Sequence, residues 1–382
     1  MQSSKSSPAE STFSSYRRQL HQQPEVSGKE TNTAALVQHW LEAYKPDKII
    51  QNIGGAGFCA IFDSRVAGPT LLFRAELDAL PIAEKSTLAY ASQTLGVSHT
   101  CGHDGHMAIL LALAAKIHSQ PPIRGRVILL FQPAEEIGAG AALVLADARF
   151  TDLQPDMVFA LHNLPGYDLG EILLRDGVFA AASVGLLIEL KGKTSHAGYP
   201  EQGINPSLAL SQLLKTLPQL PEQLGDAFGL LTIVGCELGE RNFGISAGDA
   251  SLACTLRAFE QQPFEKLQQA ALALVEQTAA EHHLDCSISW HEGFAAVQND
   301  SSCNQRVSTS AEKLQFTVKH TAAPFRWSED FGLFTQKYPG SLFGIGAGKN
   351  CAALHHPDYD FPDALIASGS QLFFEIIREE LG

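Results

Sequence analysis

Four short apolar runs of the chain end in charged or metal-ligating side chains. TLLF leads into RAELDALP, RVILLF leads into QPAEE, MVFAL ends at His162, and SLFGIGAG precedes a loop with His355 and His356. Between the first two runs, the almost continuously apolar HDGHMAILLALAAKIHS predicts a buried crossover helix. Short apolar strands that alternate with helices are typical of a mostly parallel sheet with both faces covered. We therefore expect an α/β domain that gathers these side chains at one edge, because such sheets bind ligands beyond the carboxyl ends of their strands.

The segment before these runs contains one clear helix signal. Apolar residues of TNTAALVQHWLEAY recur at helical spacing, which predicts an amphipathic helix packed on a core. The glycine cluster at residues 54–57 lacks the Lys-Ser/Thr pair or the dinucleotide pattern of a phosphate-binding loop, so a turn is expected there. The serine-rich first dozen residues are expected to lack regular structure.

A different pattern occupies residues 178–293. The predicted strands are VGLLIELKG, FGLLTIVGCELG, DASLACTLRAF and DCSISWHEGF, and the predicted helices are NPSLALSQLLKTLPQL and FEKLQQAALALVEQTAAEHH. Their β-α-β-β-α-β order is that of a small α+β ferredoxin-like domain with both helices on one face. Because the mixed pattern resumes afterwards, we predict that this domain is inserted into a discontinuous larger domain of residues 1–177 and 294–382.

Length and composition narrow the class of protein. The 382 residues are too many for one ordinary core, which agrees with two domains. A formal net charge of -14 and the lack of any Lys/Arg-rich block argue against nucleic acid or an anionic membrane as a partner. No apolar run is long enough to span a bilayer, and the N-terminus lacks the apolar core of a signal peptide. The seven cysteines follow no disulfide framework, so we expect the reducing cytoplasm.

The densest group of potential metal ligands is SHTCGHDGHM, residues 98–107. Thiolate and imidazole are favoured ligands of zinc and similar cations. In an extended segment, Cys101 and His103 would point to the same side and approach one ion, and the thiolate could bridge two. Two alternatives stay open for this stretch. Cys101 could be a nucleophile activated by His103, or the histidines could simply cap the helix that follows.

The adjacent carboxylates of Glu135 and Glu136 could have two different chemical roles. Beside a cation, one carboxylate can be a ligand while the other acts as a general base toward a metal-bound water. A solvated acidic pair in a loop is the alternative, and the position directly after an apolar run makes it less favourable. A lone histidine such as His162 is more often a satisfied rim residue than a ligand. Either member of the pair His355 and His356 could be exposed.

Seven motifs occur in the order seen in metal-dependent aminoacylase-type amidohydrolases and metallopeptidases. They are RAELDALP, HTCGHDGHMA, QPAEE, LHNLPG, GKTSHAGYPEQGINP, SEDF and LHHPDYDF. Over nearly the whole chain, the sequence resembles the branch of hippurate hydrolase, auxin-conjugate hydrolases and bacterial N-acyl-amino-acid amidohydrolases. The resemblance implies hydrolysis of a small N-acyl amino acid with two divalent cations per subunit. Zinc is expected, and manganese, nickel or cobalt are alternatives.

The resemblance also implies roles for individual residues. The five matched metal ligands are Cys101, His103, Glu136, His162 and His355. Cys101 takes the bridging position, which aspartate fills in other branches. Glu135 matches the general base, and His196 matches a histidine that stabilises the tetrahedral oxyanion, expected across the interface of a homodimer or homotetramer. The inserted domain is expected to mediate that dimerisation.

Further matches concern the surroundings of the metal centre. Asp78 matches an acidic residue that supports the metals, although Glu76 replaces the histidine that usually stands two residues earlier. The three residues expected to support the ligands are His99, Asp104 and His106. A homologue that binds metal without turnover is the remaining alternative, but a purely structural zinc site needs no additional base.

Three residues are candidates for contact with the substrate. Asn242 and Arg257 in the inserted domain are expected to bind the substrate carboxylate, for which arginine offers a bidentate contact. Glu329 of SEDF is expected to line the site, although Ser-Glu-Asp is also typical of a helix start.

Overall fold

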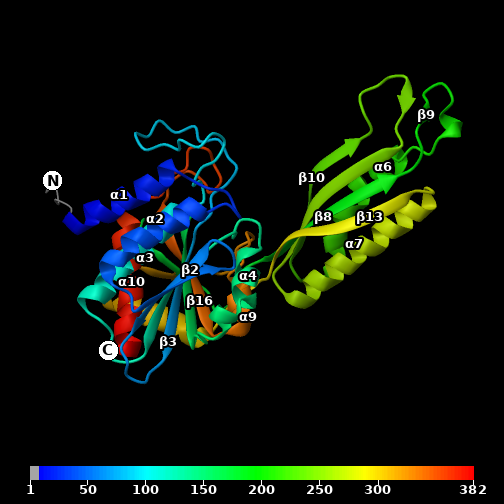
Figure 1. The fold of residues 1–382 in the computed structure, drawn as a ribbon. Coiled ribbons are helices and arrows are strands. Elements are labelled where there is room, and N and C mark those ends of the chain that lie inside the picture. The colour runs from blue at the N-terminus through cyan, green and yellow to red at the C-terminus, as the bar shows by residue number, and fades with distance from the viewer. Residues whose placement is uncertain (1–7) are drawn as a thin grey trace. The chain divides into compact units, whose positions relative to one another are not determined.

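The computed structural model describes residues 8–382, which divide into two compact units (Figure 1). The first unit contains the residues up to Phe179 together with Val297–Ala323 and Asp330–Gly382, and the second contains Ala180–Ala296 and Pro324–Glu329. The short segment Pro324–Glu329 joins the second unit because the N–H of Ala181 donates to the carbonyls of Phe325 and Trp327, at 3.1 Å each. Sequence periodicity gave no sign of this return of the chain.

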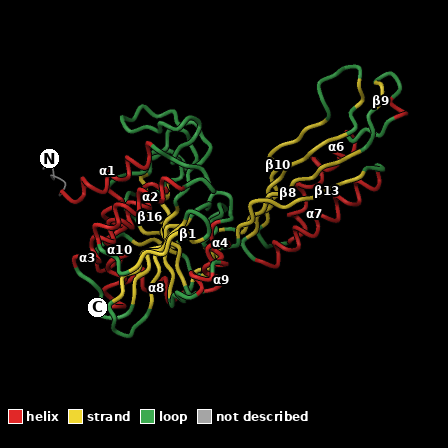
Figure 2. Tube along the Cα trace, viewed as in Figure 1, coloured by secondary structure: helices red, strands yellow, loops and turns green. Residues whose placement is uncertain are grey.

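The first unit is built on an eight-stranded sheet. In spatial order its strands are β1 (Lys48–Ile53), β2 (Gly57–Asp63), β4 (Arg126–Gln132), β3 (Thr70–Glu76), β5 (Met157–Pro165), β16 (Gly340–Gly348), β6 (Ile172–Leu174) and β15 (Val318–His320). The four apolar runs of the sequence form the adjacent strands β4, β3, β5 and β16, and all three pairs between them are parallel. The prediction of a mostly parallel α/β sheet is confirmed, and because these four strands are parallel, their carboxyl ends share one edge. Figure 2 shows the strands of this sheet in yellow among helices in red.

Helices cover both faces of this sheet. One face carries α1 (Pro8–Gln22), α2 (Thr31–Leu41), α3 (His103–Ser119), α8 (Ser301–Lys313) and α10 (Ala364–Leu381). The other carries α4 (Gly140–Ala146), α5 (Ala148–Thr151) and α9 (Gly332–Lys337). Helix α3 is the predicted crossover helix, and its apolar residues are buried against Phe73 of β3 and Phe373 of α10 in one core. Side chains at alternate positions of the strands face opposite layers, so every strand position in the centre is buried.

The N-terminal helix α1 was not predicted. It begins at Pro8, so the expectation of irregular structure was wrong from that residue onward, and residues 1–7 lie outside the described part of the chain. Phe13, Arg17 and Leu20 are buried along one face of α1, whereas Ser15 is exposed on another. Serines thus occupy the solvent side of a helix whose buried face includes a charged residue, which weakens the apolar periodicity.

The predicted second helix and glycine turn are both present. Helix α2 continues into a 3-10 turn, η1 (Glu42–Tyr44), and Val37 and Leu41 are fully buried. Gly54 and Gly55 form the turn between β1 and β2 with φ values of 63° and 116°, a region that favours glycine.

The second unit contains a four-stranded antiparallel sheet. Its strands, in spatial order, are β10 (Gly229–Leu238), β12 (Asp249–Ala258), β8 (Ala182–Lys191) and β13 (Asp285–Phe294). Helices α6 (Ser207–Thr216) and α7 (Gln261–Glu281) contact each other and share one apolar core with this sheet. Short elements not yet described occur in both units. They are β7 (Gly177–Ala180), β9 (Ser195–His196), η2 (Pro200–Gln202), η3 (Leu217–Leu224), β11 (Ile245–Ser246) and β14 (Val297–Asn299). Among the described residues, no helix combines the length and apolar character needed to cross a membrane.

Candidate functional site

The five matched metal ligands lie together at the carboxyl edge of the central sheet. Three mutually close groups contain them, each with ligand atoms within 4.8 Å of one another: Cys101 with His103 and His162, Cys101 with Glu136 and His355, and His103 with Glu135 and Glu136. The groups share members, so together they form one continuous cage. Residues that are up to 254 positions apart meet there because parallel strands deliver their carboxyl ends to the same edge.

Cys101 and His103 reach this cage by a different backbone than expected. The segment is not extended: Gly102 has a φ of 91°, and His103 is the first residue of α3. Gly102 at the N-cap has no side chain to cap the helix, and His103 Nδ1 bonds to the carbonyl of Asp78 instead, so the alternative of helix-capping histidines receives no support. A side chain on Gly102 would collide with Asn163, as a Cβ there would lie 2.6 Å from its Oδ1 atom. The turn at Gly102 therefore allows the segment that carries Cys101 and His103 to lie close to Asn163 near the end of β5.

Hydrogen bonds orient the two buried imidazoles. His103 Nδ1 donates to the backbone carbonyl of Asp78 at 2.9 Å, and His162 Nδ1 donates to the carbonyl of Asn163 at 2.9 Å. Because a carbonyl only accepts, both Nδ1 atoms carry hydrogen, and each Nε2 atom can offer a lone pair to a cation. His162 Nε2 lies 3.5 Å from Cys101 Sγ. His103 Nε2 is buried and makes no hydrogen bond with any described residue.

The charges around the cage favour a cation. Burial alone would lower the pKa of His103, but the carboxylates of Glu76, Asp78 and Glu136 outweigh it and raise the pKa to about 10. Burial, reinforced by Glu136 and Glu135, raises the pKa of the Cys101 thiol well above its usual range. The protein alone therefore does not stabilise a thiolate here. A set of thiol, imidazole and carboxylate donors with excess negative charge fits divalent cations such as zinc.

The structure distinguishes the two histidines of the His355–His356 pair. His355 has a φ of 65°, and its N–H donates to the carbonyl of Thr100 at 2.9 Å. This places His355 Nε2 at 3.8 Å from Glu136 Oε2. Both side chains are exposed, but the Nδ1 atom of His356 accepts the N–H of Asp358 at 3.2 Å instead of facing the ligands. Only His355 of this pair therefore contributes to the cage.

Asp78 supports the cage through three hydrogen bonds. Its backbone carbonyl holds His103, and its Oδ2 atom accepts the Ser27 hydroxyl at 2.7 Å and the N–H of Glu136 at 2.9 Å. Although burial disfavours a charged carboxylate, His103 and these donors lower the pKa of Asp78. Asp78 thus links His103, through its backbone carbonyl, and the segment that carries the paired glutamates, through its side chain.

Glu76 is part of a buried polar chain behind the ligands. Its carboxylate pairs with Arg74 and with His106, whose Nδ1 atom lies 2.6 Å from Glu76 Oε2. The other His106 nitrogen lies 2.5 Å from Asn163 Oδ1. Burial opposes the charge on Glu76, but Arg74, His106 and His103 hold its pKa well below the usual range. The glutamate that stands in place of a histidine is therefore a fully paired anion.

The other two expected supporting residues, Asp104 and His99, lie near His21 of α1. Asp104 accepts from Arg17 at 3.0 Å and from His21 at 2.8 Å, which ties α3 to α1. His99 is buried, and neither of its ring nitrogens has a hydrogen bond with a described residue. Burial lowers the pKa of His99 to about 4, so this imidazole is neutral.

Asp330 is a site residue that sequence reasoning missed. Its carboxylate accepts from Arg74 at 2.6 Å, from Gln132 at 2.8 and 2.9 Å, and from the N–H of Ala141 at 2.8 Å. Its own N–H lies 3.4 Å from Glu135 Oε1. The motif SEDF drew attention to Glu329, which is also buried. An acid pair next to an apolar run was the available signal, as it had been for Glu135.

The residues matched in the second unit occupy two different places. His196 of β9 pairs with Ile245 of β11, and Asn242 lies three residues before that strand, so both lie at one tip of the unit. Arg257 lies near the other end of β12, where it donates to Ser328 Oγ at 2.9 Å. Eight residues of extended strand span about 25 Å. Asn242 and Arg257 of one chain therefore cannot bind the same carboxylate.

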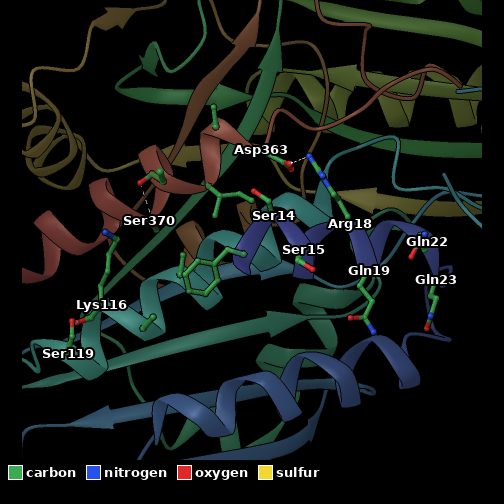
Figure 3. Close-up of a pocket in the computed structure, with 16 residues that line it drawn as sticks. Ser14, Ser15, Arg18, Gln19, Gln22, Gln23, Lys116, Ser119, Asp363 and Ser370 are labelled. Atoms are coloured by element: carbon green, nitrogen blue, oxygen red, sulfur yellow. Dashed lines mark hydrogen bonds and ion pairs between the residues drawn. The ribbon is translucent and has the colours of Figure 1, made fainter. Parts of the chain in front are cut away.

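A separate surface cavity of about 1090 Å³ lies between α1, α3 and α10 (Figure 3). None of the matched site residues lines it. Two of its charged side chains, Arg18 and Asp363, form an ion pair at 2.7 Å, and Lys116 donates to Gln371 at 2.7 Å. The cavity is therefore distinct from the cage and carries no comparable group of ligands.

Comparison with known proteins gives a consistent result. Residues 72–379 match the peptidase family M20/M25/M40. The chain is 32% identical over 367 residues to an N-acetyl-L-cysteine deacetylase of Bacillus subtilis strain 168, covering 96% of this chain and 87% of that protein. It is 31% identical over 338 residues to an N-acetyldiaminopimelate deacetylase of Enterococcus faecalis, covering 87% and 88% of the two chains.

A solved structure extends the likeness to the fold. A Bacillus subtilis protein described as a dinuclear metal-binding peptidase from the M20 family aligns with a TM-score of 0.81 at 28% identity, covering 98% of each chain. The resemblance found in the motifs is thereby confirmed over nearly the whole chain. The chain belongs to the peptidase family M20/M25/M40, within its branch of amidohydrolases and aminoacylases, and is a hydrolase that acts on amide bonds.

Proposed function

We propose that this protein hydrolyses the amide bond of a small N-acyl amino acid to a carboxylic acid and a free amino acid, with Glu135 as general base. One observation carries the proposal. The adjacent carboxylates of Glu135 and Glu136 both lie beside the buried His103 Nε2, at 4.0 and 3.8 Å, in a cage of metal-ligand type. Two relatives of similar length are named for deacetylation of N-acetylated amino acids, which supports this substrate class.

Divalent metal ions are the cofactors that this donor set fits. The proposed ligands of two ions are Cys101, His103, Glu136, His162 and His355. When bound, such ions polarise a carbonyl and lower the pKa of water, to about 7 in known zinc enzymes. We expect zinc, with manganese, nickel or cobalt as alternatives, because the ligands include both soft and hard donors.

Glu135 has the position that a general base requires. Its side chain is almost fully buried, and the N–H of Asp330 approaches one of its oxygens. We propose that Glu135 accepts the proton of the attacking water and then donates it to the departing nitrogen. Burial keeps bulk water from competing for that proton. Asp78 keeps the neighbouring Glu136 in place through its backbone N–H.

We also propose that the protein works as a homodimer or homotetramer in the cytoplasm. Strand β10 lies at the edge of its sheet and exposes Val234 and Leu238, and such an edge can pair with a second chain. His196 is exposed at the tip of the same unit, where it can serve the site of another subunit as the oxyanion donor. Asn242 at this tip can bind the substrate carboxylate. All seven cysteines are free thiols, which suits a reducing compartment.

A substrate panel combined with elemental analysis tests the proposed function. We expect the purified protein to contain two divalent cations per chain and to hydrolyse at least one of a set of N-acetyl, N-benzoyl and indoleacetyl amino acids. The assay measures release of the free amino acid. Bound metal without turnover of any substrate in the panel would favour a metal-binding homologue that is not an enzyme.

Subunit mixing tests the role of His196 across an interface. Two inactive variants, Glu135→Gln and His196→Ala, are coexpressed with different tags so that mixed dimers can form. If His196 acts in the partner's site, each mixed dimer contains one site with both residues intact. Random pairing then restores about a quarter of the wild-type activity, because half of the dimers are mixed. Activity no higher than that of the separate variants contradicts the proposed exchange.

A further inference from the structure

The loop that carries the paired glutamates has an unusual backbone. Ala134, directly before Glu135, has a φ of 53°, in a left-handed region that alanine adopts only at a cost. The turn closes through the carbonyl of Ala134, which accepts the N–H of Gly140 at 2.9 Å. Gly140 cannot carry a side chain, since a Cβ there would lie 1.7 Å from the carbonyl oxygen of Pro133. The orientation of the Glu135 side chain therefore depends on a strained backbone conformation at Ala134, which must be stabilised by contacts with other residues.

Glu30 contacts that residue from the N-terminal part of the chain. Its fully buried carboxylate accepts the N–H of Ala134 at 2.8 Å and the N–H of Gly28 at 2.8 Å, both on Oε1. Glu30 stands at the start of α2, but its side chain makes no capping hydrogen bond to that helix. Its Oε2 atom has no hydrogen bond with any described residue. The side chain thus points away from its own helix and into the loop of the base.

A second bond fixes the other side of Glu135. The N–H of Glu136 donates to Asp78, and Asp78 in turn accepts the hydroxyl of Ser27. The N–H groups of Ala134 and Glu136, on either side of Glu135, are therefore held by two buried carboxylates. Residues 27–30 take part in both contacts, because Glu30 binds Ala134 and Ser27 binds Asp78. These bonds join parts of the chain that are 58 and 104 residues apart.

We propose that Glu30 is a positioning residue for the general base, because its carboxylate holds the N–H of Ala134 and so fixes the direction of Glu135. The inference rests on the proposed function of Glu135. Without the acceptor, the buried N–H of Ala134 loses its partner and the loop can relax out of the left-handed conformation. A displacement of about 1 Å at a reacting group can reduce a rate on the order of 10²-fold.

Three variants of the full-length, metal-loaded protein separate this role from a general effect on folding. Glu30→Met keeps the length of the side chain but removes the acceptor oxygen. Glu30→Gln keeps an acceptor in the place of Oε1. Glu25→Met is the matched control, because Glu25 also holds a backbone N–H, that of Thr33 at 2.8 Å, at the start of α2 but away from the base.

Hydrogen exchange of the peptide spanning residues 131–141 is the structural readout, and it does not depend on any activity. We expect the amide hydrogens of this peptide to exchange at least about tenfold faster in Glu30→Met than in the wild type. Their exchange rates in Glu30→Gln and Glu25→Met should be close to those of the wild type. In the amidohydrolase assay, kcat of Glu30→Met should fall about tenfold or more, with KM and metal content nearly unchanged. Glu30→Gln should recover most of that loss.

Two results would overturn the inference. One is unchanged exchange of residues 131–141 in Glu30→Met, and the other is an equal loss of kcat in Glu30→Met and Glu25→Met. If the protein proves to have no amidohydrolase activity, the proposed function fails while the exchange measurement still decides whether Glu30 holds the loop.

Discussion

Replacing Glu135 by glutamine is expected to lower kcat by about 10²- to 10⁴-fold while the protein keeps its metal ions. Glutamine has the same size but cannot accept the proton of the attacking water. Because Glu136, Cys101 and the histidines remain, the cage should still bind its cations. The measurement compares kcat on the best substrate of the panel with the metal content of the same preparation.

The neighbouring glutamate provides the contrast for this experiment. Glu136→Gln should lose metal as well as activity, since Glu136 lies near both Cys101 and His355 in the cage. The two substitutions change the charge equally and differ by one position. A Glu135→Gln protein with bound metal and nearly normal turnover would show that another residue is the base.

Removal of the cations by a chelator is expected to abolish activity, and addition of zinc, manganese or cobalt should restore it. The same treatment should lower Tm, because ions that bind only the folded state stabilise it by mass action. Without cations, the carboxylates of Glu135 and Glu136 stay close together beside His103 in a largely buried site. Activity and thermal unfolding are followed before chelation, after chelation and after each metal is added.

Matched variants separate this metal centre from a cysteine nucleophile. Cys101→Asp keeps an anionic ligand and should retain metal and part of the activity, whereas a thiol enzyme would lose all of it. The raised pKa of the Cys101 thiol already disfavours a reactive thiolate. His355→Ala should weaken metal binding, while His356→Ala, one residue away and outside the cage, should not. Full activity of chelated protein would refute the metal-dependent mechanism.

The first unit shows how much of a fold the local pattern of apolar residues can predict. Strands β3, β4, β5 and β16 and helix α3 were predictable because central parallel strands and their crossover helix are buried on all sides, which produces consecutive apolar residues. Helix α1 was missed because its buried face contains Arg17 and His21, paired with acidic residues elsewhere in the chain. Its apolar periodicity was therefore too weak to recognise.

The second unit shows the limit of motif matching. Asn242 and Arg257 both matched candidates for the substrate carboxylate, yet they lie near opposite ends of β12. A motif records the type and order of residues but not the distance between them. The return of Pro324–Glu329 to this unit was equally invisible, since it depends on backbone hydrogen bonds to Ala181.

The amino-acid sequence by itself determined the class of fold, the ligand-type residues at the strand ends and the family of the chain. These features depend on local burial and on motif order, both of which can be read along the chain. Motif order also selected His355 rather than His356 as a ligand. Only the tertiary structure decided that Asp330 contacts the loop of the base and that Glu30 holds Ala134. Those choices depend on hydrogen bonds between residues far apart in the chain, and such bonds leave no periodic signal in the sequence.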